Sequence, residues 1–142
     1  MATVFDVAQY ILAQAGEMTA MKLQKLVYYA QAWSLVWDQR PLFDERIEAW
    51  ANGPVSPDLY KQHAGNFLVS EIKVGNTTAL DNIAQETINA VLEYYGDKHP
   101  QWLSDLTHSE APWLDARGDT PAGERSNAPI TLAAMAEYYG SL

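Results

Sequence analysis

The segment of residues 20–37 constrains the fold of this chain most, because it has helical periodicity and is apolar on nearly all sides. One helix face, at about 100° per residue, carries Leu23, Leu26, Val27, Ala30, Ser34 and Trp37. Most of the opposite face is formed by Met21, Tyr28, Ala32, Leu35 and Val36. Such a helix is normally central and covered by its neighbours. We therefore predict a hub helix over residues 20–37, capped by Thr19, with Trp37 in the core.

Two lysines near the start of this helix oppose its dipole. Lys22 and Lys25 lie in the first two turns, where the positive end of the dipole disfavours cations by roughly a few tenths of a kcal/mol or more. In a chain of net charge -9, we expect these lysines to have carboxylate neighbours or a binding partner. A surface ion pair and a role in partner binding are the two interpretations.

Length and composition indicate one folded domain. The chain has 142 residues, of which 48% are hydrophobic and 11% aromatic, so it is long enough to bury a core without crosslinks. It has no cysteine, which excludes disulfides and thiolate metal sites. The N-terminus lacks the basic start of a signal peptide, and no apolar run has the length of a membrane span. We expect a single domain over residues 1–142, cytoplasmic and without membrane association.

The charge balance limits the partners. Eighteen acidic residues stand against nine basic ones, and no cluster of Lys and Arg is longer than a pair. Proteins that bind nucleic acid usually present a basic face that neutralises phosphates. We therefore expect no direct nucleic-acid partner, whereas a basic protein would be attracted by this field.

The other segments predict a mainly α-helical domain of five or six helices around the hub, with at most a small β element. Helices are predicted over residues 4–15, 57–64, 83–95, 100–108 and 131–139, with a turn that adds one helical turn at most over residues 109–114. A short strand or extended loop is predicted over residues 46–51, and an edge strand or two-stranded ribbon over residues 68–74. The polar stretch of residues 117–129 is predicted to be a flexible loop, whose alternative role is to clasp a partner.

A dipeptide in the first half of the chain predicts a tight turn. Gly53-Pro54 lies between the extended segment and a helix that Ser56 caps and Pro57 begins. Trp50 and Tyr60 flank this turn, and loops held by a rigid scaffold often carry binding residues. We expect these two aromatic residues in a surface groove, with core packing as the alternative.

Several blocks, in this order, resemble the Panacea-domain (SocA-like) antitoxin family. They are Lys22-Leu23-Gln24-Lys25-Leu26, Tyr28-Tyr29-Ala30-Gln31-Ala32-Trp33, Pro41-Leu42-Phe43, Glu48-Ala49-Trp50, Gly53-Pro54-Val55 and Tyr60. A later block, Thr107-His108 with Glu110, Pro112 and Trp113, is also similar to that family. Ser56 departs from the expected pattern, in which an apolar residue follows Gly53-Pro54-Val55, but the turn and the cap stay intact. The resemblance covers roughly residues 5–140.

The resemblance implies an antitoxin of a bacterial or phage toxin–antitoxin pair, with a cognate toxin as partner. Such antitoxins are thought mostly to neutralise by direct protein contact, and one member is described as an adaptor that delivers its toxin to a ClpXP protease. No protease-docking motif or added DNA-binding module is recognisable in this chain. Direct binding is therefore the first hypothesis, and a protease adaptor is the alternative.

Two sets of residues are singled out on these grounds. The predicted partner-binding residues are Trp50, Tyr60, Trp113, Lys22 and Lys25, on an acidic surface with exposed aromatic side chains. The predicted structural residues are Leu23, Tyr29, Trp33, Gly53, Pro54 and His108.

An enzyme that reverses the toxin's modification is the alternative from another class. His63, His99 and His108 are the only histidines, and no two have the spacing of a metalloprotease helix. His108 near Asp105 and Glu110 would form an acid–base group, although a structural role in tying a turn to the core is the commoner use. Without a nucleophile elbow or a phosphate-binding loop, we expect no catalytic residue, metal or cofactor.

Overall fold

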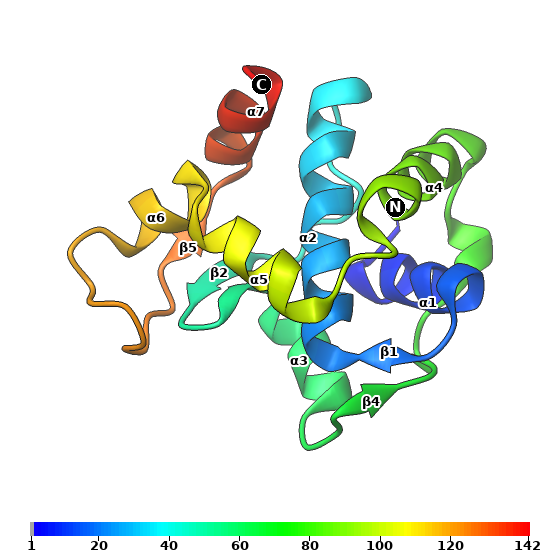
Figure 1. Cartoon of the computed structure of the whole chain (residues 1–142). Helices are drawn as coiled ribbons and strands as arrows, with labels where there is room; N and C mark the ends of the chain where they lie inside the picture. The colour runs from blue at the N-terminus through cyan, green and yellow to red at the C-terminus, as the bar shows by residue number, and fades with distance from the viewer. Residues whose placement is uncertain (1) are drawn as a thin grey trace.

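Helix α2 (Ala20–Trp37) is the element against which most others pack in the computed structural model, which describes residues 2–142 (Figure 1). In Figure 1 it runs through the middle of the molecule, with α1 (Val4–Ala15) and α4 (Asn82–Tyr95) on one side. Helices α5 (Pro100–His108) and α7 (Leu132–Gly140) also contact it. All residues from 23 to 32 are buried, which confirms the predicted hub.

The capping residues predicted from the sequence begin their helices. Thr19 Oγ1 accepts a hydrogen bond from the backbone N–H of Lys22 at 3.1 Å. Ser56 Oγ accepts one from the backbone N–H of Leu59 at 3.3 Å and begins α3 (Pro57–His63). Each bond satisfies a backbone donor that the first helical turn leaves free. Both predicted helix starts are therefore confirmed.

Residues 2–142 form seven α-helices, the hub and six others, in agreement with the prediction of five or six helices around the hub. Helix α6 (Ala111–Arg117) lies in a segment for which the sequence indicated at most one helical turn. Pro112 lies in its first turn, where a proline is tolerated because the backbone N–H has no helical partner. The mainly α-helical fold class is confirmed.

Two small antiparallel sheets complete the fold of residues 2–142. Strand β2 (Ile47–Trp50) pairs with β3 (Gly53–Val55) on one side and with β5 (Pro129–Ile130) on the other. Strand β1 (Met18–Thr19) pairs with β4 (Leu68–Val69). The small β elements therefore lie in the two regions where the sequence predicted them, and each recruits a partner from elsewhere in the chain.

The second of these elements is shorter than the ribbon considered for residues 68–74. Only Leu68 and Val69 pair in a ladder. Beyond them the backbone N–H of Ile72 donates to Gln9 Oε1 at 2.6 Å, so the chain follows α1 and leaves the sheet. The alternating polarity of residues 68–74 therefore reflects the burial of Ile72 in the core and does not indicate a continued strand.

The predicted loop after α6 is folded around a buried arginine. The Arg117 guanidinium donates to the carbonyl oxygens of Pro121 at 2.9 Å and Glu124 at 2.7 Å. It also donates to the carbonyl oxygen of Ala49 in β2 at 3.0 Å. A single side chain thus ties the loop to the sheet.

Trp37 is exposed, in contrast to our expectation of a core residue. Its exposed fraction is 48%, and its ring stacks on Trp33 with 5.0 Å between centroids. Trp37 is the last residue of α2, so no further turn of that helix covers its other face. Helical spacing correctly showed that Trp37 lies on the same face of α2 as the core residues. It did not show that the neighbouring elements end before they cover Trp37.

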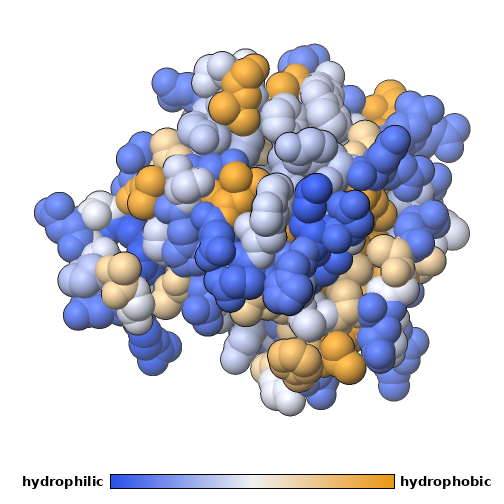
Figure 2. Space-filling view, in the orientation of Figure 1, coloured by the Kyte–Doolittle hydropathy of each residue, from blue (hydrophilic) through white to orange (hydrophobic). Residues whose placement is uncertain are grey.

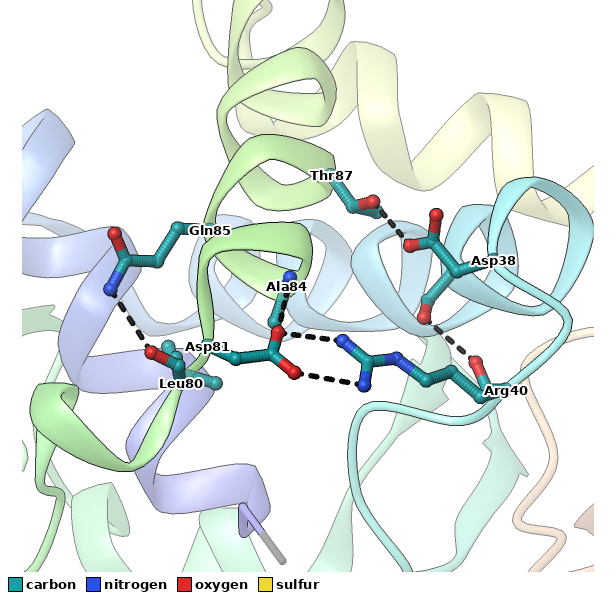
Figure 3. Close-up of polar contacts among 8 residues, drawn as sticks. Asp38, Arg40, Leu80, Asp81, Ala84, Gln85 and Thr87 are labelled. Atoms are coloured by element: carbon teal, nitrogen blue, oxygen red, sulfur yellow. Dashed lines mark hydrogen bonds and ion pairs between the residues drawn. The ribbon is translucent and has the colours of Figure 1, made fainter.

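Polar side chains join the end of α2 to the start of α4 (Figure 3). Arg40 donates two hydrogen bonds to the Asp81 carboxylate, at 2.7 and 2.9 Å, and Thr87 donates to Asp38. The Arg40 guanidinium, together with the Ala84 N–H that Asp81 caps, lowers the pKa of Asp81 to about 2. Because this ion pair is exposed to solvent, its role is to orient the loop more than to stabilise the fold.

A carboxylate lies among tyrosines in the core beside α2. Glu110 Oε1 accepts hydrogen bonds from the hydroxyls of Tyr29 and Tyr139, both at 2.7 Å. The Tyr139 hydroxyl also contacts that of Tyr28 at 3.0 Å. Burial raises the pKa of Glu110, and the two tyrosine bonds oppose this shift only in part.

The surface is mostly hydrophilic on the face shown in Figure 2. Hydrophobic residues gather at the lower edge of this view, near β4, where Phe67 and Leu68 are exposed. Within residues 2–142, no helix is both long and apolar enough to cross a membrane.

Candidate functional site

A pocket of about 680 Å³ lies between the start of α2, helix α3 and the hairpin of β2 and β3. Its volume is in the range of about 300–1,000 Å³ that is usual for ligand pockets. The lining residues are Ala20, Met21, Gln24, Lys25, Arg46, Glu48, Trp50, Ala51, Asn52, Val55, Pro57, Tyr60, His63, Arg125, Ser126 and Asn127. We call it the Lys25 pocket.

Two aromatic residues meet at this pocket. Trp50 ends β2, and its ring lies edge-on to Tyr60 of α3 with 5.1 Å between the centroids. Trp50 Nε1 donates to Glu48 Oε1 at 2.9 Å, which holds the indole in place. Tyr60 is 41% exposed. The sequence placed both residues beside a groove, and the structure brings them together there.

The tight turn lies two residues earlier than the sequence indicated. Trp50 pairs with Gly53 across the hairpin, so Ala51 and Asn52 form a two-residue loop of the usual hairpin length. Gly53 and Pro54 are the first residues of β3 and not the turn itself. Pro54 lies in an outer strand of the sheet, where a proline is tolerated.

His108 holds this hairpin loop. Its Nε2 contacts the carbonyl oxygen of Ala51 at 2.9 Å, and its Nδ1 contacts that of Ser104 one helical turn earlier. These contacts tie the loop to α5, which is the kind of structural role predicted for His108. The acid–base group considered with Asp105 and Glu110 does not form, because Asp105 accepts from Gln101 and Glu110 binds the tyrosines.

Lys25 is buried without a charge partner. Its exposed fraction is 1%, and it makes no ion pair within residues 2–142. Burial lowers its pKa from 10.5 to about 8, and no nearby carboxylate opposes this effect. Our expectation of carboxylate neighbours is therefore wrong for Lys25, whose side chain reaches the pocket beside Gly53.

Lys22 differs from Lys25 although the two are one turn apart. It is partly exposed, does not line the pocket, and forms no ion pair within the described residues. The surface ion pair considered for it is therefore absent there. The fold separates two residues that the sequence treated alike.

The pocket is locally positive in an acidic protein. It is lined by Lys25, Arg46 and Arg125 but by only one carboxylate, that of Glu48. Arg46 Nε pairs with Glu48 Oε2 at 2.7 Å, so these two charges neutralise each other. The net charge of the whole chain is -9. Lys25 and Arg125 thus give this site the opposite sign to the rest of the surface.

Gln24 fastens the base of the pocket. Its Oε1 accepts from the Ser56 N–H at 2.9 Å, and its Nε2 donates to the Ser56 carbonyl at 3.3 Å. Nε2 also lies 3.0 Å from His63 Nε2, and burial lowers the pKa of His63. Gln24 was not among the predicted site residues. Its polar side chain in a mostly apolar helix could have indicated a buried hydrogen-bonding role.

Trp113 is buried, which contradicts its place among the predicted exposed aromatic residues. Its exposed fraction is 5%, and its Nε1 donates to the Trp50 carbonyl at 2.8 Å. The His108 ring and the Arg117 guanidinium pack on it, at 4.1 and 4.8 Å from the ring centroid. Trp113 is therefore a buried support of the hairpin in this structure and is not part of its exposed surface.

The remaining structural residues lie where the sequence predicted. Leu23 and Tyr29 are fully buried on α2. Trp33 is partly buried, and its Nε1 donates to the Tyr95 hydroxyl at 3.0 Å. Arg46 and Arg125 were not singled out, because nothing local shows that the chain brings them to one pocket.

Comparisons with known proteins identify the family of the chain. Residues 23–114 match the family described as "Antitoxin SocA-like, Panacea domain". Antitoxin SocA of Caulobacter vibrioides (strain NA1000 / CB15N) is 29% identical, over 75% of this chain and 66% of that relative. The chain thus spans just under two thirds of that protein's length. No solved structure matches significantly.

Proposed function

The chain belongs to the SocA-like antitoxin family with a Panacea domain, and from this premise we propose that it is an antitoxin that neutralises a cognate toxin protein by direct binding. The match over residues 23–114 contains Lys25, Trp50 and Tyr60. The proposed contact surface therefore lies within the region by which the family is defined.

The observation that carries the binding mechanism is the aromatic pair at the Lys25 pocket. Trp50 lies in β2 and Tyr60 in α3, and Gln24 joins Ser56, the N-cap residue of α3, to the hub helix. Tryptophan and tyrosine are enriched among residues that dominate binding energy, especially beside pockets. A rigid scaffold lowers the entropy lost on binding. These features support recognition of a protein partner at this site.

We propose stoichiometric binding in preference to catalysis. His108, the histidine considered for acid–base chemistry, is used to hold the hairpin loop. The net charge of -9 supports a partner whose surface is mainly basic, because opposite fields accelerate association.

The test is co-expression of this chain with the product of the neighbouring gene in bacteria. Growth, the amount of the complex in a pull-down and the toxin level on a blot are measured on the same cultures. We expect growth to be rescued, with a stable complex and an unchanged toxin level. Tyr60→Ala should weaken both rescue and complex.

Phe67→Ala is the matched control, because Phe67 is an exposed aromatic residue outside the pocket. It should leave rescue unchanged, and circular dichroism checks that both variants fold. Rescue with loss of the toxin would instead support a protease adaptor. Rescue at a substoichiometric level without a complex would support an enzyme that reverses the modification.

A further inference from the structure

Lys25 lies at the base of its pocket in a position that is unfavourable for the isolated protein. An ammonium group removed from water loses hydration energy, which an ion pair or hydrogen bonds normally replace. Within residues 2–142 Lys25 forms no ion pair although its exposed fraction is only 1%, and its side chain is part of the pocket lining. Strongly shifted ionisable groups that face a pocket are typical of functional sites.

The groups of β3 and α5 that lie next to the Lys25 side chain are uncharged. Gly53 of the hairpin lies beside its side chain, and a Cβ on Gly53 would lie 3.0 Å from Lys25 Nζ and 3.1 Å from Thr107 Oγ1 of α5. The Thr107 hydroxyl already donates to the Ser104 carbonyl at 2.8 Å. The charged groups of the lining, Arg46 with Glu48 and the exposed Arg125, come from the hairpin side and the loop.

We propose that the Lys25 pocket binds a carboxylate held next to an apolar or aromatic group, with the Lys25 ammonium as its charge partner. The apolar part would pack against Trp50 and Tyr60, and Met21 and Val55 supply further apolar surface. An ion pair is stronger in such a site than in water, because fewer waters screen it.

The charge at the base of the pocket favours a monovalent group. Glu48 neutralises Arg46, and Arg125 is exposed and solvated, so Lys25 is the one desolvated cation among the described lining residues. A carboxylate matches that single charge. A phosphate dianion would bring a second charge into a largely apolar space, which costs more hydration energy.

The carboxylate is most simply supplied by the partner protein, as an acidic side chain or a chain terminus. The net charge of -9 repels free anions at long range, whereas a carboxylate on a toxin segment is brought to the pocket by the rest of the interface. This assignment of the source rests on the proposed function. The proposal that the pocket binds a carboxylate does not depend on that function.

The first experiment tests the chemistry without a toxin. The full chain, with ¹³C- and ¹⁵N-labelled lysine, is titrated with benzoate, with benzamide as an uncharged analogue of the same shape, and with inorganic phosphate. We expect benzoate to shift the Lys25 signals saturably and to raise the Lys25 pKa. Benzamide and phosphate should bind at least about tenfold more weakly, since benzamide has no charge to pair with the ammonium and phosphate brings a second charge into the pocket.

Two variants complete this experiment. Lys25→Met keeps a side chain of similar volume without the charge and should lower benzoate affinity at least about tenfold. Lys61→Met removes an exposed lysine of α3 outside the pocket and should change nothing. The proposal is overturned if benzoate and benzamide bind equally well or if phosphate binds more tightly than benzoate. It is also overturned if Lys25→Met binds benzoate as well as the natural chain does. If Lys25→Met does not fold, the comparison of the three probes on the natural chain still decides.

The second experiment tests the source of the carboxylate with the neighbouring gene product. We expect Lys25→Met to weaken the complex and benzoate to compete with the toxin. If benzoate binds but the toxin is indifferent to Lys25→Met and to benzoate, the pocket takes a free carboxylate and the assignment to the toxin is overturned. If no complex forms while benzoate binds, the proposed function fails and the pocket chemistry stands.

Discussion

Gly53 leaves the space through which the side chain of Lys25 reaches its pocket. A Cβ on Gly53 would lie 2.5 Å from Lys25 Cε and 3.0 Å from Lys25 Nζ. Gly53 also has φ of +122°, a conformation that side chains rarely adopt. The glycine of the hairpin and the lysine of the hub helix, read as separate signals in the sequence, thus form one structural unit.

Gly53→Ala should therefore cost more stability than a positive φ alone explains. We expect a loss of about 2–4 kcal/mol in chemical denaturation, because backbone strain and a clash with Lys25 add. Gly65→Ala is the control: Gly65 has φ of +87° but no atom within 4 Å of its Cβ position. Its loss should be about 1 kcal/mol. Equal losses for the two variants would show that the contact with Lys25 has no energetic weight.

Lys25→Met should stabilise the protein at pH 7. The natural chain keeps an unpaired ammonium buried, and the difference between pKa values of 10.5 and about 8 corresponds to at most about 3 kcal/mol. Methionine fills a similar volume without this cost. We expect a gain of about 1–3 kcal/mol in urea denaturation, with Lys61→Met within about 0.5 kcal/mol of the natural chain. A clear loss of stability would mean that Lys25 has a favourable partner.

The stability of the natural chain should rise with pH above about 8. Between the folded pKa of about 8 and the ordinary value of 10.5, the unfolded chain binds more protons at Lys25 than the folded one, so the free energy of unfolding increases with pH. The rise is measured up to pH 9.5 as the difference between the natural chain and Lys25→Met, because buried tyrosines such as Tyr28, whose pKa burial raises, lower the stability as the pH approaches 10. Lys25→Met should show a flatter profile over the same range. Parallel profiles for the two proteins would contradict the lowered pKa.

Glu110→Gln should change the pH dependence of stability with the opposite sign. Burial raises the Glu110 pKa above its ordinary value of 4.5. The folded chain therefore retains this proton to higher pH than the unfolded chain. The contribution of Glu110 to the free energy of unfolding falls as the pH rises from 4.5 through the folded pKa. Glutamine still accepts from Tyr29 and Tyr139 but does not ionise. Thermal melts between pH 4 and 7 should show that the variant gains stability relative to the natural chain as the pH rises. A difference in melting temperature that does not change with pH would contradict this prediction.

Arg117→Met should release the loop that follows α6. Three carbonyl oxygens, those of Ala49, Pro121 and Glu124, would lose their charged donor. We expect a loss of about 2–4 kcal/mol in stability and faster amide hydrogen exchange over residues 118–128. Arg125→Met, at an exposed position of the same loop, should leave both measurements close to those of the natural chain. An unchanged exchange rate in Arg117→Met would show that the loop is held by other contacts.

Local features of the sequence were enough for most of the helices. Thr19 and Ser56 cap the helices that they were predicted to cap, because a capping bond depends on residues three positions apart. The buried face of α2 followed from its spacing for the same reason. Helix α6 was underestimated because its stability depends on contacts with β2, β5 and α7, which no local pattern reports.

Exposure was predicted less well than secondary structure. Trp37 and Trp113 were assigned to the core and the surface respectively, and the structure reverses both. Helical spacing shows which residues share a face, whereas burial depends on which distant segment covers that face. Trp113 is covered by Arg117 and by the hairpin that ends at Trp50.

By itself, the sequence determined the central helix, the mainly helical class and the family, because periodicity, capping and ordered blocks of residues are properties of contiguous chain. It also marked Lys22 and Lys25 as opposed to the helix dipole. Only the tertiary structure decided that Lys25 is buried and unpaired while Lys22 faces solvent. Its neighbours Gly53 and Thr107 come from segments 28 and 82 residues further along the chain, and the electrostatics of a buried charge depend on what such segments bring beside it.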